Sequence, residues 1–204
     1  MCISKCTSCQ GDPEIGIIKI KHRLFILVFM KHLTDADIES LYKEFQTPPH
    51  VRAHCRGVTD CAMKLAQALK DAGKFDPDFA LLYGAGMIHD MARKYDHHEI
   101  VAADRLTELG FDLEADIVRG HMRIMTYHEI EHITEADLLY ISDRMVLEDT
   151  FVGVQKRFDY LREKMARKGW DPDSEIVRNN RRRAEVFVAA IEAATGRSVF
   201  EICG

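Results

Sequence analysis

From residue 31 onward, hydrophobic positions recur every three or four residues along the chain. That spacing is the period of an amphipathic α-helix, whose apolar stripe packs against a core. Start signals agree with it: Thr34 precedes Asp37 as in a capping box, and Asp76-Pro77 sets an N-cap before a first-turn proline. We therefore expect an all-α fold with helices over residues 34–45, 48–72, 77–93, 97–109, 113–124, 134–149, 150–168 and 174–195.

The first 29 residues differ in character from the rest of the chain. They contain Cys2, Cys6 and Cys9 and the strand-like stretch IGIIKIKHRLFILVF. The C-x3-C-x2-C spacing matches the cluster motif of radical-SAM enzymes, but no alternation of strands and helices follows it, as their barrel would need. A translation start at Met30 would leave every predicted helix intact. We therefore expect residues 1–29 to be an extension outside the functional chain and residues 30–204 to form a single domain.

Several predicted apolar stripes carry a histidine or an aspartate at a position that should face the core. A single core histidine is more often hydrogen-bonded to a backbone carbonyl than bound to a ligand. The recurrence of such residues on successive helices is a different matter and calls for a common explanation. The stripes are His54–Val58–Cys61–Leu65–Leu69, Phe79–Leu82–Gly86–His89, His98–Ala102–Leu106–Leu109, Ile117–His121–Ile124 and Ala136–Leu139–Asp143–Val146.

Together with Asp90, these residues form a set of inward-facing ionisable groups that needs a shared partner. A buried carboxylate without a compensating charge is strongly destabilising. A divalent cation is the simplest partner, because it neutralises carboxylates and binds neutral imidazoles. His89 and Asp90 are neighbours on a predicted helix, so their side chains point about 100° apart. The two side chains can therefore bind one site from two sides, or Asp90 can bridge two ions.

The ordered set His54, His89-Asp90, Asp143 resembles the HD-domain superfamily of metal-dependent phosphohydrolases. The local sequences HCRGV at 54–58, LLYGAGMIHDMARK at 81–94 and LLYISDRMV at 138–146 fit that resemblance, which covers roughly residues 47–150. Adding His98 and His121 gives the order of the dinuclear branch, which includes symmetrical diadenosine tetraphosphate hydrolases and also di-iron oxygenases of the inositol oxygenase type. His97 competes with His98 for one position, and we prefer His98 because it lies on an apolar stripe.

The resemblance implies an HD-like helical bundle with a metal core over residues 47–150, C-terminal helices over 150–195, and one or two divalent ions of iron, manganese, zinc, cobalt or magnesium. The implied activity is hydrolysis of a phosphoester or phosphoanhydride of a nucleotide or small phosphorylated metabolite by a metal-activated water. Alternatives are a di-iron oxygenase and a non-catalytic domain that senses a nucleotide. The expected ligands are His54, His89, Asp90, His98, His121 and Asp143.

Basic residues near the ligands are the candidates for holding substrate phosphates. Arg93 and Lys94 follow Asp90 by one helical turn, and we expect them to act with Asp90 in catalysis. Arg144 follows the last ligand and Arg52 precedes the first, so both are candidate substrate-binding residues. HDMARK has no glutamate shortly after the HD pair, which argues against the mononuclear nucleotidases of the superfamily that use one as a base.

Net charge, hydropathy and cysteine content restrict the partners and the cellular location that we expect. The net charge of −5 gives no reason to expect nucleic acid or an anionic membrane as a partner. The longest apolar run, LFILVFM at 24–30, is far below the roughly 20 residues needed to span a bilayer. Six cysteines in 204 residues do not suggest a disulfide framework. The expected compartment is therefore the cytoplasm.

Overall fold

The computed structural model of the chain describes residues 16–20, 23–27, 31–122 and 130–204. The chain divides into two units, Met1–Lys31 and His32–Gly204. In the first unit, β1 (Gly16–Ile20) pairs antiparallel with β2 (Arg23–Leu27), with Ile18 opposite Phe25. These strands lie in the stretch that the sequence marks as strand-like. Cys2, Cys6, Cys9 and Met30 lie outside the described residues, and whether residues 1–29 belong to the functional chain stays a prediction.

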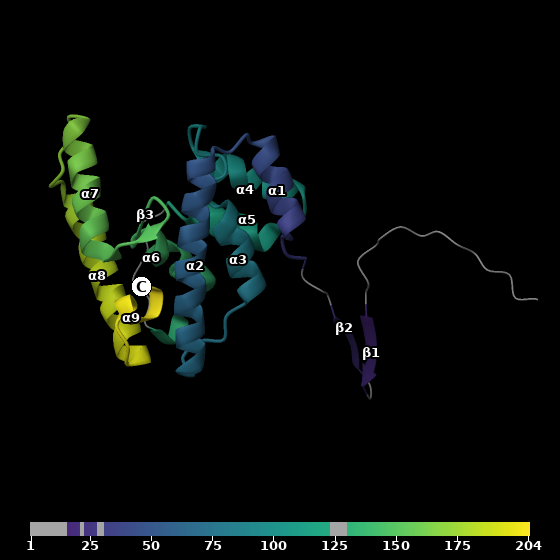
Figure 1. Cartoon of the computed structure of the whole chain (residues 1–204). Helices are drawn as coiled ribbons and strands as arrows, with labels where there is room; N and C mark the ends of the chain where they lie inside the picture. Colours follow the sequence, from purple (N-terminus) through teal and green to yellow (C-terminus); the bar gives the residue numbers. More distant parts are fainter. Residues whose placement is uncertain (1–15, 21–22, 28–30, 123–129) are drawn as a thin grey trace, which may run out of the picture. The chain divides into compact units, whose positions relative to one another are not determined.

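The second unit is helical, which confirms the all-α fold (Figure 1). Its two long C-terminal helices and the long central helix run close to the predicted ranges, whereas a short C-terminal helix was not predicted. The helices are α1 (Asp35–Glu44), α2 (Pro49–Asp71), α3 (Phe79–Ile88), α4 (His98–Glu108), α5 (Asp112–Gly120), α6 (Glu135–Asp143), α7 (Gly153–Arg167), α8 (Glu175–Thr195) and α9 (Val199–Cys203), with a 3-10 turn at Ile130–His132.

Helix α2 lies between two groups of elements. Its buried side chains, such as Val58 and Leu65, belong to a core shared with α3, α6, α7, α8 and α9. A second core joins α1, α3, α4 and α5 around Leu41, Met87 and Leu106. Figure 1 shows α2 with α7–α9 on one side and the α1, α3, α4, α5 group on the other. Helix α3 contributes to both cores and so connects them.

Three helices end earlier than the hydrophobic pattern predicts: α3, α6 and also α5, which ends at Gly120 and not at 124. Helix α3 ends at Ile88 rather than at 93, and the chain continues in tight turns such as Met91 N–H to Ile88 O and Arg93 N–H to Asp90 O, each 3.0 Å. The pattern misleads here because Met91 and Ala92 are buried even though they are not helical. The HD pair therefore lies just past a helix end and not inside a helix.

Helix α6 ends at Asp143 and not at 149 as predicted. The chain then forms a small antiparallel hairpin of β3 (Val146–Leu147) and β4 (Thr150–Phe151). Glu148, in the turn, has a left-handed backbone with φ of 56°. The carbonyl of Asp149 comes so close to α2 that a Cβ added at Gly57 would lie 2.4 Å from it. Gly57 thus allows the hairpin turn to pack directly on α2.

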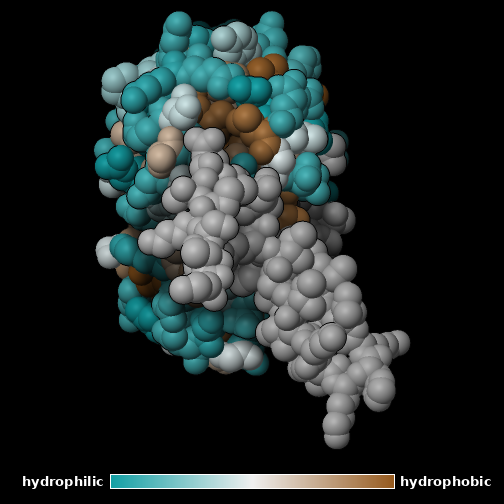
Figure 2. Space-filling view, turned by 90° about the vertical axis from the view of Figure 1, so that its right-hand side faces the viewer, coloured by the Kyte–Doolittle hydropathy of each residue, from teal (hydrophilic) through white to brown (hydrophobic). Residues whose placement is uncertain are grey.

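Charged residues make up 30% of the whole chain. The face in Figure 2 is largely hydrophilic outside the residues drawn in grey, with smaller hydrophobic areas between the polar ones. Among the helices that the structure describes, none combines the length and the apolar character that a membrane span requires.

Candidate metal centre

All six predicted ligands lie in one place, although they come from five segments of the helical unit. His54 is on α2, His89 and Asp90 directly follow α3, and His98 is the first residue of α4. His121 directly follows α5, and Asp143 is the last residue of α6. They form two groups, His54 with His89 and Asp143, and Asp90 with His98 and His121, in each of which the potential ligand atoms lie within 4.8 Å of one another.

Asp90 lies between the two groups. Its Oδ1 is 3.1 Å from His98 Nε2 and 3.5 Å from His121 Nε2. Its Oδ2 is 3.8 Å from His54 Nε2 and 4.0 Å from His89 Nε2. Each carboxylate oxygen thus faces a different group, which is the arrangement that a carboxylate bridging two ions requires.

The backbone fixes which nitrogen of three histidines faces inward. Nδ1 of His89 donates to Gly86 O at 2.8 Å, and Nδ1 of His121 donates to Val118 O at 2.6 Å. Both acceptors are carbonyls near a helix end, where the helix leaves its last carbonyls unpaired. Nδ1 of His54 donates to Glu148 O at 2.6 Å. Since a carbonyl only accepts, Nε2 of His89 and of His121 carries the free lone pair that a metal ligand needs, whereas Nε2 of His54 is hydrogen-bonded to Asp143 Oδ1 at 3.1 Å.

Several of these inward nitrogens have no protein partner. Nε2 of His89, His98 and His121 is buried and makes no hydrogen bond within the described part of the chain. The short distance from His98 Nε2 to Asp90 therefore lacks hydrogen-bond geometry. Buried polar atoms are almost always paired, so three orphaned atoms in the two ligand groups need an explanation. A cation in each group would satisfy them, one beside His89 and one beside His98 and His121, so the residues present fit divalent metal ions.

The protonation states also suit a cation. Burial lowers the pKa of His89 to about 4, with His121 adding to the effect and Asp90 opposing it. Burial raises the pKa of Asp90, but His121, His98 and the Arg93 charge outweigh it and hold that pKa well below its usual range. His54 behaves differently. Burial lowers its pKa, but the hydrogen bond to Asp143 at 3.1 Å and the Asp143 charge outweigh burial, so the pKa of His54 is raised. At neutral pH His89 is thus neutral and Asp90 is ionised.

The choice between the two neighbouring histidines is clear in the structure. The His98 side chain is 17% exposed and lies beside Asp90, whereas that of His97 is 80% exposed. His97 is the N-cap of α4 and has a left-handed backbone with φ of 53°. That conformation turns the chain so that only His98 reaches the site.

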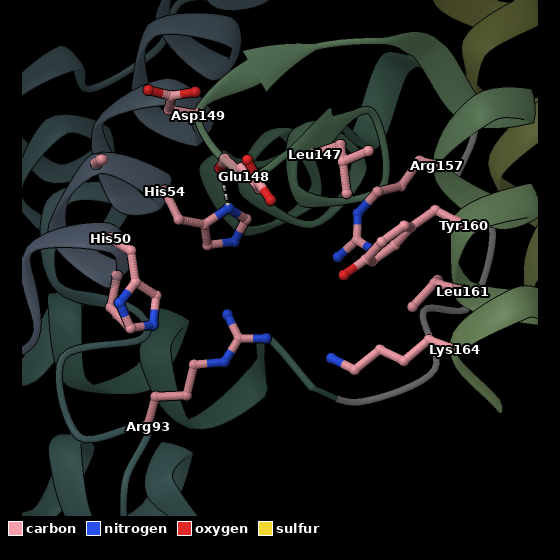
Figure 3. Close-up of a pocket in the computed structure, with 12 residues that line it drawn as sticks. His50, His54, Arg93, Leu147, Glu148, Asp149, Arg157, Tyr160, Leu161 and Lys164 are labelled. Carbon is pink, nitrogen blue, oxygen red and sulfur yellow. Dashed lines mark hydrogen bonds between the residues drawn. The ribbon is translucent and has the colours of Figure 1, made fainter. Parts of the chain in front are cut away.

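A cavity of about 630 Å³ opens beside His54 (Figure 3). Arg93 lines it and also lines a smaller cavity of about 250 Å³ that contains Asp90, His98 and Asp143. Figure 3 shows the Arg93 guanidinium directed into the larger cavity. Arg93 also donates to Asp90 Oδ2. Arg93 therefore connects the candidate metal centre with the space where a substrate would bind.

The other predicted basic residues fall into two groups. Arg144 is at the site, where it donates to Asp143 and lines the smaller cavity. Lys94 is exposed and directed elsewhere, with its Nζ 3.4 Å from Gln46 Oε1 and above the Tyr95 ring. Arg52 binds the backbone carbonyls of Thr47 at 2.8 Å and Tyr42 at 3.2 Å. The structure thus brings Arg93 and Arg144 to the site and leaves Lys94 and Arg52 outside the two cavities described above.

Most residues that line the larger cavity were not predicted from the sequence, among them His50, Glu148, Arg157, Tyr160 and Lys164. Arg157, Tyr160 and Lys164 lie on α7 with spacings of three and four, so they share one helix face. Arg157 is buried, and its Nε donates to Asp143 O at 3.3 Å. Burial and the charges of Arg144 and Arg93 lower its pKa, and Asp143 opposes this. A basic and aromatic helix face was the available signal, but a solvated face has the same pattern.

Comparisons with known proteins add no relative. A scan against protein-family models, a search of curated proteins and a search of solved structures each find no match. What the structure establishes is a helical unit with a buried cluster of histidines and aspartates that could hold a metal ion.

Proposed function

We propose that this protein is a metal-dependent phosphohydrolase of the HD-superfamily type. The observation that carries the proposal is the pair of ligand groups sharing Asp90 beside a cavity with cationic side chains. His54, His89 and Asp143 would hold one divalent ion, and His98 and His121 the other, with Asp90 between them. Such ions activate water and offset the charge on phosphoryl oxygens.

The protein's own contribution would be to bind and orient the phosphoryl group. Arg93, Arg157 and Lys164 point into the cavity in Figure 3 and would hold its oxygens. Arg144 would neutralise Asp143, with which it is already paired. The substrate we expect is a nucleotide or another small phosphorylated metabolite.

The cationic lining favours hydrolysis over the alternatives on the same ligand set. An oxygenase acting on a neutral substrate has no need for three cations beside the metals. A non-catalytic sensing domain has no need for six inward ionisable groups, because each would destabilise the fold without a bound ion. The di-iron oxygenase and the sensor therefore remain outcomes of the test and are not the proposal.

Phosphate release tests the proposal. Metal-free protein would be reloaded separately with Mn²⁺, Fe²⁺, Co²⁺, Zn²⁺ or Mg²⁺ and incubated with nucleoside mono-, di- and triphosphates and sugar phosphates. We expect release with at least one metal, and a loss of at least about 1,000-fold in Asp143→Asn. Asp104→Asn, which alters an exposed aspartate paired with Arg119, is the matched control and should keep full activity. Oxygen consumption by the iron form without phosphate release would overturn the proposal.

A further inference from the structure

Glu148 places a carboxylate in the larger cavity, and this carboxylate is not one of the candidate metal ligands. In Figure 3 its side chain points from the β3–β4 turn into the cavity, where it faces Arg157 and Tyr160 of α7. No hydrogen bond or ion pair joins this carboxylate to another residue in the described ranges 31–122 and 130–204, although the backbone carbonyl of Glu148 holds His54. The group is therefore available to a ligand.

Backbone contacts hold Glu148 in place. Its left-handed φ of 56° is uncommon for a residue with a side chain, and such conformations persist where the surroundings enforce them. Two contacts enforce it here: the His54 hydrogen bond to Glu148 O at 2.6 Å and the close approach of Asp149 O to Gly57. The turn thus fixes the direction in which the Glu148 side chain leaves the backbone, and its carboxylate has no salt bridge within the described residues that a ligand would have to break.

The opposite side of the cavity is cationic. Arg93, Arg157 and Lys164 point into it, and Lys164 has no hydrogen bond or ion pair with any residue that the structure describes. Burial and the nearby charges of Arg93, Lys168 and Arg157 lower the pKa of Lys164, which shows how closely these cations are grouped. This side is suited to an anion, whereas Glu148 would repel one.

The division of charge restricts what the cavity can accept. A ligand that is anionic along its whole length, such as pyrophosphate, would bring negative charge against Glu148. A ligand with a phosphate at one end and hydroxyl groups at the other would satisfy both sides, because a carboxylate accepts two hydrogen bonds from neighbouring hydroxyls. At about 630 Å³ the cavity has the size of a site for a small organic molecule, well beyond a phosphoryl group.

We infer that the substrate is a phosphate ester of a hydroxyl-rich alcohol, such as a sugar or the ribose of a nucleotide, and that Glu148 is the residue that binds its hydroxyls. This inference rests on the proposed function and narrows it to one class of substrate. Glu148 is a specificity-determining residue in this account, and Arg93, Arg157 and Lys164 select the phosphate.

Matched substrate pairs test the inference. The values of kcat/KM would be compared for adenosine 5′-monophosphate against its 2′,3′-dideoxy analogue, and for ribose 5-phosphate against n-pentyl phosphate, with the metal-loaded full chain. We expect the hydroxylated member of at least one pair to be preferred by about 10–100-fold, the effect of a hydrogen bond to a charged group. A preference in both pairs indicates that a sugar phosphate suffices, and one in the nucleotide pair alone indicates that the base is also needed.

The variant Glu148→Gln keeps the shape of the side chain and removes its charge. It should reduce the preference by at least about threefold and tighten inhibition by inorganic pyrophosphate, because the repulsion is gone. Asp104→Asn is again the matched control, since its carboxylate is exposed, pairs with Arg119 and lines neither cavity. Equal wild-type rates within both pairs, or an unchanged preference in Glu148→Gln, would overturn the inference alone. No turnover of any substrate would overturn the proposed function and this inference with it.

Discussion

The candidate site is built from side chains whose surroundings prepare them for a cation. His54, His89 and His121 each give their Nδ1–H to a backbone carbonyl, so each presents Nε2 to the centre. Asp90 directs one oxygen to each group of ligands. These features follow from where each residue lies relative to a helix end or a turn. The orientation of the rings therefore does not depend on the metal.

The neighbouring histidines allow a sharp test of one ligand. His98→Asn should weaken binding at the Asp90–His98–His121 group by at least about 100-fold, because a first ligand is lost, and should reduce bound metal by about one equivalent. His97→Asn changes an exposed residue to one that tolerates its left-handed backbone, so it should bind metal as the wild type does. Elemental analysis measures the equivalents of bound metal, and calorimetric titration measures the affinity for it. Equal binding by the two variants would remove His98 from the ligand set.

His89 makes the stability of the metal-free protein depend on pH. Its pKa is about 4 when folded and about 6.5 when unfolded, so the unfolded state binds the extra proton between these values. Its contribution is therefore complete above about pH 6.5 and is lost as pH falls towards 4, on the order of 3 kcal/mol. Urea unfolding from pH 7 to 4 should show a steeper fall for the wild type than for His89→Gln. Parallel curves would contradict this assignment.

At the scale of elements, hydrophobic spacing predicts the ends of long helices well. It predicts helix ends poorly where the chain turns inside the core. The ranges of α2 and α8 agree with their stripes to within a residue or so. The ends of α3 and α6 do not, because buried Met91, Ala92, Met145 and Val146 continue the apolar pattern through turns. All six candidate ligands could be selected from the sequence because each lies on or beside a stripe. The α7 face was missed because Arg157, Tyr160 and Lys164 resemble a solvated surface.

The contact between α2 and the β3–β4 turn can be tested by mutation. Gly57→Ala would place a Cβ 2.4 Å from Asp149 O, so either the turn or the helix must shift. We expect a loss of about 1–3 kcal/mol in the free energy of unfolding, the usual cost of overpacking. Gly120→Ala is the control, since an added Cβ there meets nothing within 4 Å and alanine favours a helix. If urea unfolding shows Gly57→Ala to be as stable as Gly120→Ala, the turn does not pack as described.

At the scale of the whole molecule, the ligands join the two cores of the helical unit. His54 and Asp143 extend from α2 and α6, which share one core, and His98 and His121 extend from α4 and α5, on the other. Asp90 lies at the end of α3, which belongs to both. Two bound metal ions would therefore link helices of the two cores, and metal binding should stabilise the unit as a whole.

Metal addition should raise the melting temperature. An ion that binds only the folded state at 100 times its Kd stabilises that state by about 2.7 kcal/mol, and a chelator should reverse the gain. Asp90→Asn, which removes the shared carboxylate, should show little of it, whereas Asp104→Asn should show all of it. Calorimetric scans of the three proteins with and without Mn²⁺ measure the effect. An equal gain in Asp90→Asn would mean that the ions bind elsewhere.

The most direct test of the central claim is phosphate release measured while metal-free protein is titrated with the metal that supports activity best. The account predicts no release without metal and a rise that reaches its plateau at two equivalents per chain, because both ligand groups must be filled. Full release from the metal-free protein, or none once two equivalents are bound, would contradict it.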